Sequence, residues 1–323
     1  MDRELTRPAE ASAAPGESGA ANASSARTGT LYGFAAYLLW GLLPFYFLTL
    51  APSGAWEILL HRILWSALLC TVLTVALRQA GGLVRALRAP RQLLAVSVAG
   101  LLVAANWTIY LVAVTSGRIT EGALGYFLNP LVSVALGLVV LRESIRPLQA
   151  LAVAIGGAGG IYLAIDSGSV PWIALGLAFS FGTYGLVKKH VGVNLSALQS
   201  LTAETVVLAP LAAVAMVWLV GSGYSTFGGQ GPVHAALLAS TGVVTAVPLL
   251  LFAAAARRVT LVTIGLLQFI APILQFVSGL ALGEAMSPGR WTGFAIVWVA
   301  LVVLVADSVR HQMRARVVAP PVG

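Results

Sequence analysis

The chain has 323 residues, of which 59% are hydrophobic and only 9% are charged, with a formal net charge of +8 at pH 7 and a mean hydropathy of +0.91. A chain so apolar and so poor in charge does not stay in water as a globule, which excludes a soluble domain and predicts an integral membrane protein. Its single cysteine, Cys70, leaves neither a disulfide nor a cysteine-based metal site.

The first predicted segment, residues 1–30, is a disordered cytoplasmic tail. It is rich in Ala, Ser and Gly and contains acidic residues, and it has no apolar core of the kind that a signal peptide needs. At the other end of the chain, residues 307–323 are predicted to form a second cytoplasmic tail.

Ten apolar stretches lie between the tails, and each meets the requirement of about 20 residues for crossing a hydrocarbon core of about 30 Å. A short segment, residues 166–171, divides them into two sets of five, in residues 31–166 and 171–306. The sequence therefore predicts an all-α membrane protein with ten transmembrane helices. The expected spans are residues 31–51, 56–77, 93–114, 121–141, 147–165, 171–187, 195–219, 233–255, 260–282 and 289–306.

The positions of the basic residues predict the orientation, because Lys and Arg near span ends are retained in the cytoplasm. With the N-terminus inside, the inside segments hold 16 of the 19 Lys and Arg residues, and the outside loops hold only Arg118 and Arg290. Both termini are therefore expected in the cytoplasm. The positive charge is explained by this topology and by attraction to an anionic inner leaflet, so no nucleic-acid partner is expected.

An internal repeat relates the two halves. Residues 101–130 align with residues 243–272 without a gap, at a constant offset of 142 that also places Gly100 over Gly242. Because each half has an odd number of spans, the second copy must enter the membrane from the opposite face. Two inverted five-helix repeats are therefore predicted, a common construction of secondary transporters.

Two prolines, Pro130 and Pro272, occupy equivalent positions of the repeat inside spans. A proline within a helix removes a hydrogen-bond donor and can bend the helix. They are candidate gating hinges, with a static bend as the alternative interpretation.

The densest polar cluster inside the membrane is at the start of the second span, where Glu57 and His61 share one helical face and Arg62 and Trp65 follow. An ionisable side chain at a helix centre costs about 2.5–3.5 kcal/mol on insertion scales, so Arg62 is expected to face a cavity or a partner. Each of two residues has an alternative interpretation. For Glu57, the alternative is that the favourable interaction of a carboxylate with the positive N-terminal end of its helix alone explains the residue. His61 is either a residue that takes up a proton during transport or an interfacial hydrogen-bonding residue.

The expected counter-charge of Arg62 is Glu204, the only acidic residue well inside the second half, which lies at the same 142-residue offset. We expect the two charges to meet near the midplane, in a pair that substrate or a proton can break. The other candidate substrate-binding residues are aromatic or carry amides, as suits a pocket for an amphipathic solute, although a helix-to-helix hydrogen bond is the alternative for each. They are Trp40, His61, Trp65, Asn106, Trp107, Tyr110, Tyr126, Asn129, Gln268 and Gln275.

Four motifs carry a resemblance to a known family: Trp40 with Gly41, EILLHRILWS in the second span, NWTIY in the third, and EGALGYFLNPLVSVALG followed by Arg142 and Glu143. Together they resemble the RarD-type permeases of the EamA branch of the drug/metabolite transporter superfamily. The resemblance covers residues 31 to about 310. It implies a ten-helix, two-repeat carrier of the bacterial cytoplasmic membrane, without specifying its substrate.

The expected function is secondary transport of a small polar or amphipathic metabolite or drug, by alternating access around a midplane cavity. A proton is a candidate coupling ion, while the lack of a P-loop argues against ATP-driven transport by this chain. The lack of an HExxH motif or an acidic metal cluster predicts no cofactor and no metal, and argues against the less favoured alternative of a membrane enzyme. Expected partners are a small-molecule substrate and membrane lipids, and the oligomeric state is left open. Handling of a lipid-linked intermediate is the other alternative, which a lateral opening between helices would favour.

Overall fold

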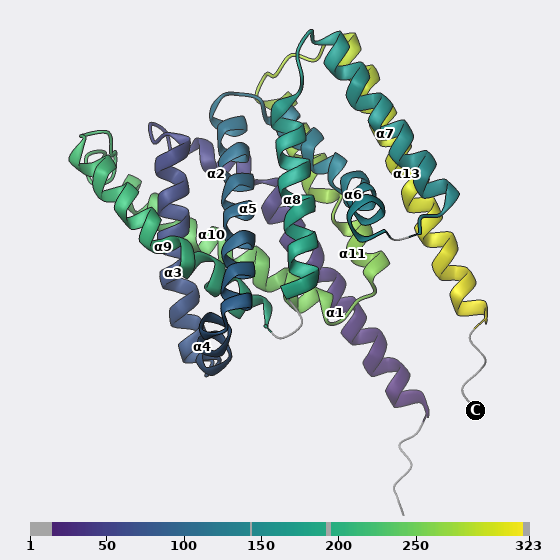
Figure 1. The fold of residues 1–323 in the computed structure, drawn as a ribbon, viewed down its shortest axis with the longest axis horizontal. Helices are drawn as coiled ribbons and strands as arrows, with labels where there is room; N and C mark the ends of the chain where they lie inside the picture. The colour runs from purple at the N-terminus through teal and green to yellow at the C-terminus, as the bar shows by residue number, and fades with distance from the viewer. Residues whose placement is uncertain (1–14, 143, 192–194, 319–323) are drawn as a thin grey trace, which may run out of the picture.

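The computed structural model describes residues 15–142, 144–191 and 195–318, and in these residues helices are joined by short loops without a strand (Figure 1). The helices are α1 (Pro15–Gly41), α2 (Leu43–Leu48), α3 (Ala55–Ala76), α4 (Ala80–Arg88), α5 (Pro90–Thr115), α6 (Ile119–Leu141), α7 (Pro147–Asp166), α8 (Trp172–Val191), α9 (Ala197–Gly221), α10 (Pro232–Ala256), α11 (Leu261–Leu267), α12 (Ile270–Ala281) and α13 (Pro288–Val318).

Nine helical stretches of the described residues are long and apolar enough to cross a membrane. One combines the end of α1 with α2, and another combines most of α11 with α12. The sixth predicted span corresponds to α8, whose described apolar part, Trp172–Lys188, is shorter than the other nine stretches. The described helices therefore confirm a multi-pass, all-helical protein.

The first predicted tail, expected to be disordered, is helical over its described residues, and the described part of the second tail is helical as well. Residues 15–30 are helical and continue directly into the first span, and residues 307–318 continue α13. No helix-breaking proline lies between either segment and its span, and the Ala-rich composition of residues 20–26 favours helix. The prediction of disorder for residues 1–14 falls outside the described residues, and so do residues 319–323 of the second predicted tail.

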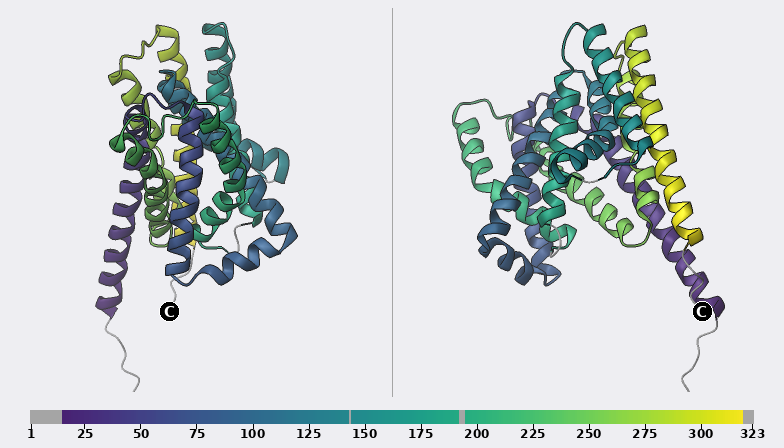
Figure 2. Two further views of the ribbon diagram at one scale, coloured as in Figure 1. Left: turned by 90° about the vertical axis from the view of Figure 1, so that its left-hand side faces the viewer. Right: turned by 45° about the vertical axis from the view of Figure 1, so that its right-hand side comes forward.

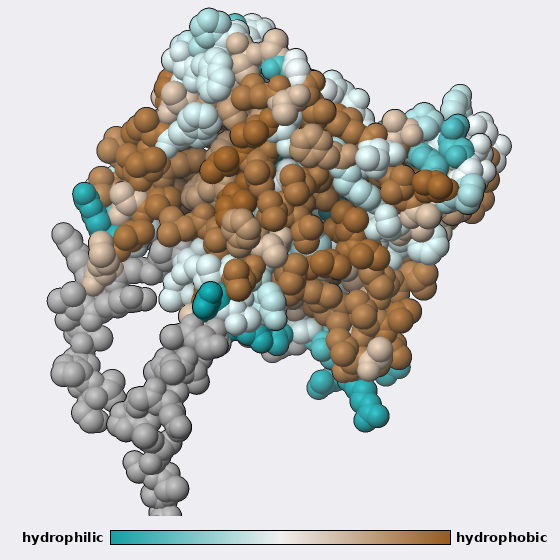
Figure 3. All heavy atoms as spheres, turned by 180° about the vertical axis from the view of Figure 1, so that it is seen from behind, coloured by the Kyte–Doolittle hydropathy of each residue, from teal (hydrophilic) through white to brown (hydrophobic). Residues whose placement is uncertain are grey.

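The surface agrees with a membrane environment. Hydrophobic side chains cover most of the face shown in Figure 3, and hydrophilic ones gather toward its margins. Large aliphatic side chains such as Leu94, Val214 and Val217 are mostly exposed within long apolar helices. A soluble protein rarely exposes so much contiguous apolar surface, whereas a lipid-facing surface requires it.

The helix boundaries repeat along the chain. Helices α3 and α9 begin at Ala55 and Ala197, and α5 and α10 begin at Pro90 and Pro232, so each pair starts 142 residues apart. The packing repeats as well: α5 packs on α8 as its equivalent α10 packs on α1, and α3, α6 and α7 pack on their equivalents α9, α12 and α13. Helices α7 and α13 lie side by side at one edge of the molecule (Figure 2).

Equivalent helices α3 and α9 run antiparallel. Just after the end of α3, Gln79 contacts the start of α9 through a 2.7 Å hydrogen bond between its Oε1 and Ser196 Oγ. At the start of α3, Glu57 contacts the segment after α9, where Thr226 N donates to its Oε1 at 2.7 Å.

The other two equivalent pairs have the same relation. The backbone N–H of Thr120, at the start of α6, donates to Glu284 just after α12 at 2.9 Å. The Nε of Arg146, which precedes α7, donates to Asp307 late in α13 at 2.6 Å. In the first two pairs the start of one helix therefore meets the end of its equivalent, and in the third the start of α7 meets the last turn of the apolar stretch of α13, Pro288–His311.

Gly100 and Gly242, which the repeat aligns, both lie where helices approach closely. A Cβ on Gly242 would lie 2.7 Å from the backbone carbonyl of Trp65 in α3, and a Cβ on Gly100 would lie 3.1 Å from the carbonyl oxygen of Glu204 in α9. Small residues at such contacts let membrane helices pack backbone to backbone. The aligned glycines thus hold α10 against α3 and α5 against α9.

We predict that Gly242→Ala lowers the stability of the detergent-purified protein, because the added methyl group must push α10 away from the α3 backbone. Overpacking of this kind costs about 1–3 kcal/mol. Gly157→Ala is the matched control, since a Cβ on Gly157 in α7 meets no atom within 4 Å. Thermal unfolding curves compare the variants, and equal midpoints for Gly242→Ala and Gly157→Ala would contradict the close-packing interpretation.

Candidate functional site

The guanidinium of Arg62 lies inside the helix bundle where α2, α3, α5 and α10 meet. Arg62 is 5% exposed, and its Nε donates a 2.9 Å hydrogen bond to Thr245 Oγ1 on α10. The guanidinium carbon lies 4.0 Å from the ring centre of Trp107 and 5.5 Å from that of Phe47. In the described part of the chain this is the only hydrogen bond of the guanidinium, and no carboxylate forms an ion pair with it.

Tyrosine side chains border the guanidinium. The rings of Tyr46 and Tyr110 pack 5.5 and 6.2 Å from Phe47, which faces the guanidinium. The Tyr110 side chain is 2% exposed, packs its ring 5.5 Å from the Tyr126 ring, and has no hydrogen-bond partner for its hydroxyl among the described residues. We call Arg62 with Phe47, Trp107, Tyr110, Tyr126 and Thr245 the Arg62 centre.

Asn106 anchors one side of the Arg62 centre. The hydroxyl of Tyr126 donates to Asn106 Oδ1 at 3.1 Å. The Nδ2 of Asn106 donates to the Leu177 carbonyl at 3.1 Å and to Ser180 Oγ at 3.0 Å, both on α8. The structure thus brings Arg62, Asn106, Trp107, Tyr110 and Tyr126 together, and Asn106 positions Tyr126 through fixed bonds to α8.

Glu204 has different partners from the one expected. Its carboxylate forms an ion pair with Lys188 Nζ at 2.5 Å and accepts a 3.2 Å hydrogen bond from the Tyr184 hydroxyl. This finding corrects the expected Arg62–Glu204 pair, which is not present among the described ion pairs. The physical reason is the antiparallel packing: each residue is seven positions after the start of its helix, so each lies about 10 Å from an opposite end of the α3–α9 pair.

Glu57 holds the segment that connects α9 and α10. Its Oε1 accepts hydrogen bonds from Ser225 Oγ at 2.8 Å, Thr226 N at 2.7 Å and Phe227 N at 3.2 Å. Its Oε2 accepts a fourth from Thr226 Oγ1 at 2.8 Å. We call this set the Glu57 loop contact. A carboxylate with four donors is occupied by the protein itself, which favours a structural or gating role over direct substrate binding.

Two histidines lie beside the Glu57 loop contact. The His61 ring packs 4.8 Å from Phe227, its Nδ1 is 3.2 Å from Trp65 Nε1, and its Nε2 has no partner among the described residues. His234, which the sequence analysis did not single out, places its Nε2 2.9 Å from both Ser53 Oγ and Thr226 Oγ1. The i,i+4 spacing of His61 and Trp65 thus places the two side chains in direct contact. No local sequence pattern predicts that His234 lies in this cluster.

Trp40 and Gln275 join the first span to the ninth. Pro44 has no N–H group, so the carbonyl of Trp40 has no helical donor four residues later. Gln275 Nε2 donates to this carbonyl at 3.1 Å, while the Gln275 Oε1 has no partner among the described residues. No hydrogen bond, ion pair or ring contact of the described residues joins Gln275, Trp40 or Gln268 to Arg62. These candidates therefore lie outside the Arg62 centre.

Asn129 and the predicted hinges differ in their local structure. Asn129 lies within α6 beside Pro130, and its Oδ1 is buried without a described partner. Pro130 interrupts no helix, whereas Pro272 follows a break, because α11 ends at Leu267 and α12 begins at Ile270. The equivalent positions are therefore not equivalent in backbone structure, and movement at either proline stays a prediction.

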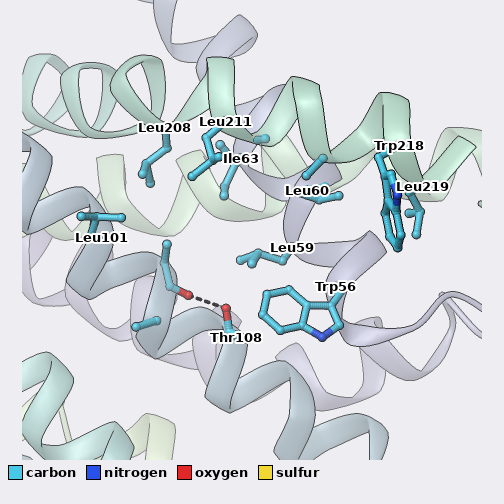
Figure 4. Close-up of a pocket in the computed structure, with 14 residues that line it drawn as sticks. Trp56, Leu59, Leu60, Ile63, Leu101, Thr108, Leu208, Leu211, Trp218 and Leu219 are labelled. Carbon is cyan, nitrogen blue, oxygen red and sulfur yellow. Dashed lines mark hydrogen bonds between the residues drawn. The ribbon is translucent and has the colours of Figure 1, made fainter. Parts of the chain in front are cut away.

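An apolar groove with a volume of about 610 Å³ opens between α3, α5 and α9 (Figure 4). Its lining includes Leu59, Leu208 and the mostly exposed Trp56 and Trp218. The Thr108 hydroxyl is already bonded to the Ala104 carbonyl at 2.7 Å, so it offers no free donor. Arg62 is not in the lining, so the groove and the Arg62 centre are separate features.

No group of three His, Cys, Asp or Glu side chains in the described residues is placed to hold a metal ion.

Comparisons with known proteins identify relatives over most of the chain, although no family model matches it. It is 48% identical over 291 residues to a protein named RarD from Streptomyces exfoliatus, covering 90% of this chain and 92% of the relative. It is 39% identical over 295 residues to the protein RarD of Escherichia coli, with coverages of 91% and 99%. An uncharacterized transporter of Pseudomonas aeruginosa is 39% identical over 289 residues, with coverages of 89% and 96%. A solved crystal structure at 18% identity matches with a TM-score of 0.57 over 89% of this chain and 99% of that one, and therefore shares the fold.

We predict that Glu57→Ala frees the segment between α9 and α10. The amides of Thr226 and Phe227 lose their acceptor, so hydrogen–deuterium exchange in a peptide covering residues 224–228 rises by about tenfold. Glu121→Ala is the control, because Glu121 accepts from Ile173 N and leaves this segment untouched. Unchanged exchange at residues 224–228 in Glu57→Ala would show that the segment is held by other contacts.

Proposed function

The chain belongs to the RarD family and is a multi-pass membrane transporter, and we propose that it is a secondary active permease for a small polar or amphipathic metabolite or drug. The observation that carries this proposal is the place of Arg62. The guanidinium is contributed by the first half, contacts Thr245 of the second half, and has no carboxylate partner in the described residues. A buried charge of this kind is expensive in a membrane helix, so it usually serves a transported solute or ion.

The proposed architecture has ten crossings in two inverted repeats, as in the EamA branch of the drug/metabolite transporter superfamily. Three observations support it: the helix starts separated by 142 residues, the antiparallel packing of equivalent helices, and the apolar helix α8 as the tenth crossing. The clustering of Lys and Arg in alternate loops supports placing both termini in the cytoplasm of a bacterium, with the chain in the cytoplasmic membrane.

The proposed mechanism is alternating access, in which the two repeats rock about a site near the midplane. The Arg62–Thr245 hydrogen bond crosses between the repeats, so a relative movement of α10 and α3 changes the surroundings of the guanidinium. The Glu57 loop contact closes one end of the α3–α9 pair and must adjust when that end opens. We propose a proton as the coupling ion because His61 is buried beside this contact with its Nε2 unbonded among the described residues.

A second candidate function is handling of a lipid-linked intermediate, and the apolar groove favours it. The groove opens at the helix surface between α3, α5 and α9, and its residues lie within membrane-spanning helices. An acyl or polyprenyl chain fits such a lining without unmet hydrogen bonds. The two candidates share the fold and differ in whether a water-soluble solute or a lipid crosses. We propose no enzymatic activity for either.

We predict that proteoliposomes containing the protein take up one class of solute from a panel of amino acids, polyamines, nucleosides and amphenicols. Arg62→Ala is expected to lower the initial rate by about tenfold or more, because bonds to a charged donor are lost. It should leave the gel-filtration profile largely unchanged. Arg290→Ala is the control, since it removes the same charge from an exposed position and should transport normally.

Normal uptake by Arg62→Ala would exclude the Arg62 centre as the transport site. A well-folded protein that moves no solute in the panel but scrambles labelled lipid between leaflets would instead support the second candidate.

A further inference from the structure

No carboxylate forms an ion pair with Arg62 in the described part of the chain. Every acidic side chain near the ends or interior of a described span, apart from Asp166 at the end of α7, has its own partner. Glu57 binds the segment after α9, Glu121 pairs with Arg118, Glu204 with Lys188, and Asp307 with Arg146, while Glu284 accepts from the first residues of α6. Neutralising Arg62 with one of these five carboxylates would therefore break an existing contact.

The surroundings of Arg62 compensate its charge only in part. The rings of Trp107 and Phe47 offer their π faces, which attract a guanidinium but accept no conventional hydrogen bond. Thr245 accepts from Nε, and the two Nη groups have no acceptor among the described residues. A buried cation needs both an opposite charge and hydrogen-bond acceptors. The two Nη groups of Arg62 can therefore bind an anion.

A second donor lies in the same centre. The hydroxyl of Tyr110 is buried and has no partner in the described structure, and the Tyr110 ring packs 6.2 Å from Phe47, whose own ring lies 5.5 Å from the guanidinium carbon. Tyr126, in contrast, already donates to Asn106. A planar guanidinium that binds two oxygens, beside one free O–H donor, is suited to an oxyanion and offers nothing comparable to a neutral amide or an amine.

We propose that the solute of this transporter carries a carboxylate or phosphate group, and that this oxyanion binds the Arg62 guanidinium and the Tyr110 hydroxyl. The rings of Phe47 and Trp107 then flank the part of the solute next to the anion. This inference rests on the proposed transport function and adds the chemical class of the substrate. It also assigns Tyr110 as a direct ligand contact.

Thermal unfolding of the detergent-purified full chain tests the proposal with matched probes. The oxyanions are phenylacetate, phenyl phosphate, acetate and inorganic phosphate, and phenylacetamide is the neutral counterpart of phenylacetate. We expect at least one oxyanion to raise the unfolding midpoint in a saturable way, because a ligand of the folded state stabilises it. Phenylacetamide should have no effect at the same concentrations.

Variants locate the effect. Arg62→Gln should abolish the stabilisation, Arg62→Lys should weaken it because an ammonium loses the two-point contact, and Tyr110→Phe should weaken the apparent affinity by about tenfold while keeping the ring. Arg290→Gln should respond like the parent protein, which controls for anions on the surface. If Arg62→Gln does not fold, Arg62→Lys and Tyr110→Phe decide the question.

Three results would overturn the proposal: no stabilisation by any of the four oxyanions, equal stabilisation by phenylacetamide, or an undiminished effect in the Arg62 and Tyr110 variants. The uptake assay separates this failure from failure of the transport function. Arg62-dependent oxyanion binding without uptake would support the binding site and contradict the proposed transport function. Uptake of a neutral solute that persists in Arg62→Gln would support the transport function and contradict the oxyanion proposal.

Discussion

Antiparallel packing of equivalent helices is the constraint on which the arrangement of this protein depends. Because α3 and α9 start 142 residues apart and run in opposite directions, equivalent residues near the helix starts lie near opposite ends of the pair. Glu57 binds the segment after α9, and its repeat equivalent Gln199 donates through Nε2 to the carbonyl of Gln79, after α3, at 2.8 Å. The two ends of one helix pair are thus tied by related contacts, a carboxylate at one end and an amide at the other.

In these apolar surroundings, the hydrogen-bond partners of a polar side chain indicate whether its role is structural. In a membrane an unpaired polar group has no water to bind, so structural polar groups are found with partners. Asn106, Glu57 and Glu204 follow this rule, since each has several hydrogen bonds to fixed protein groups. Arg62 does not, because only its Nε has a hydrogen-bond acceptor among the described residues. This contrast separates Asn106, Glu57 and Glu204, which hold helices together, from Arg62, which is the basis of the proposed solute site.

The sequence predicts the apolar helices well, because hydrophobic length is a local property, and the 142-residue offset recurs in the starts of two helix pairs. Gly100 and Gly242, aligned by the offset, prove to have the same close-packing role. The partner of Glu204 could not be derived in the same way, since a repeat offset reports equivalence and not proximity. The helical continuation of α1 before the membrane also escaped prediction, because a polar composition does not by itself exclude a helix that a neighbouring span nucleates.

Contacts between distant segments were likewise beyond the sequence. Glu57 meets Thr226 across 169 residues, and no pattern in either segment indicates the other. The same holds for His234 and for the groove between α3, α5 and α9, which depends on how three helices diverge. By contrast, the burial of Arg62 among aromatic groups was foreseeable from the cost of a charge within a span and the nearby Trp107 and Tyr110.

The most direct test of alternating access around Arg62 is the accessibility of a single cysteine at Thr245, the residue that contacts the guanidinium from the second repeat. Cys70 is fully buried and can be replaced, so Cys70→Ala with Thr245→Cys provides one reporter. The rate of its reaction with a membrane-impermeant maleimide is measured in right-side-out and in inside-out vesicles. The account predicts reaction from both sides, slowed from both by a bound oxyanion such as phenylacetate. Reaction from one side only, or from neither, would contradict it.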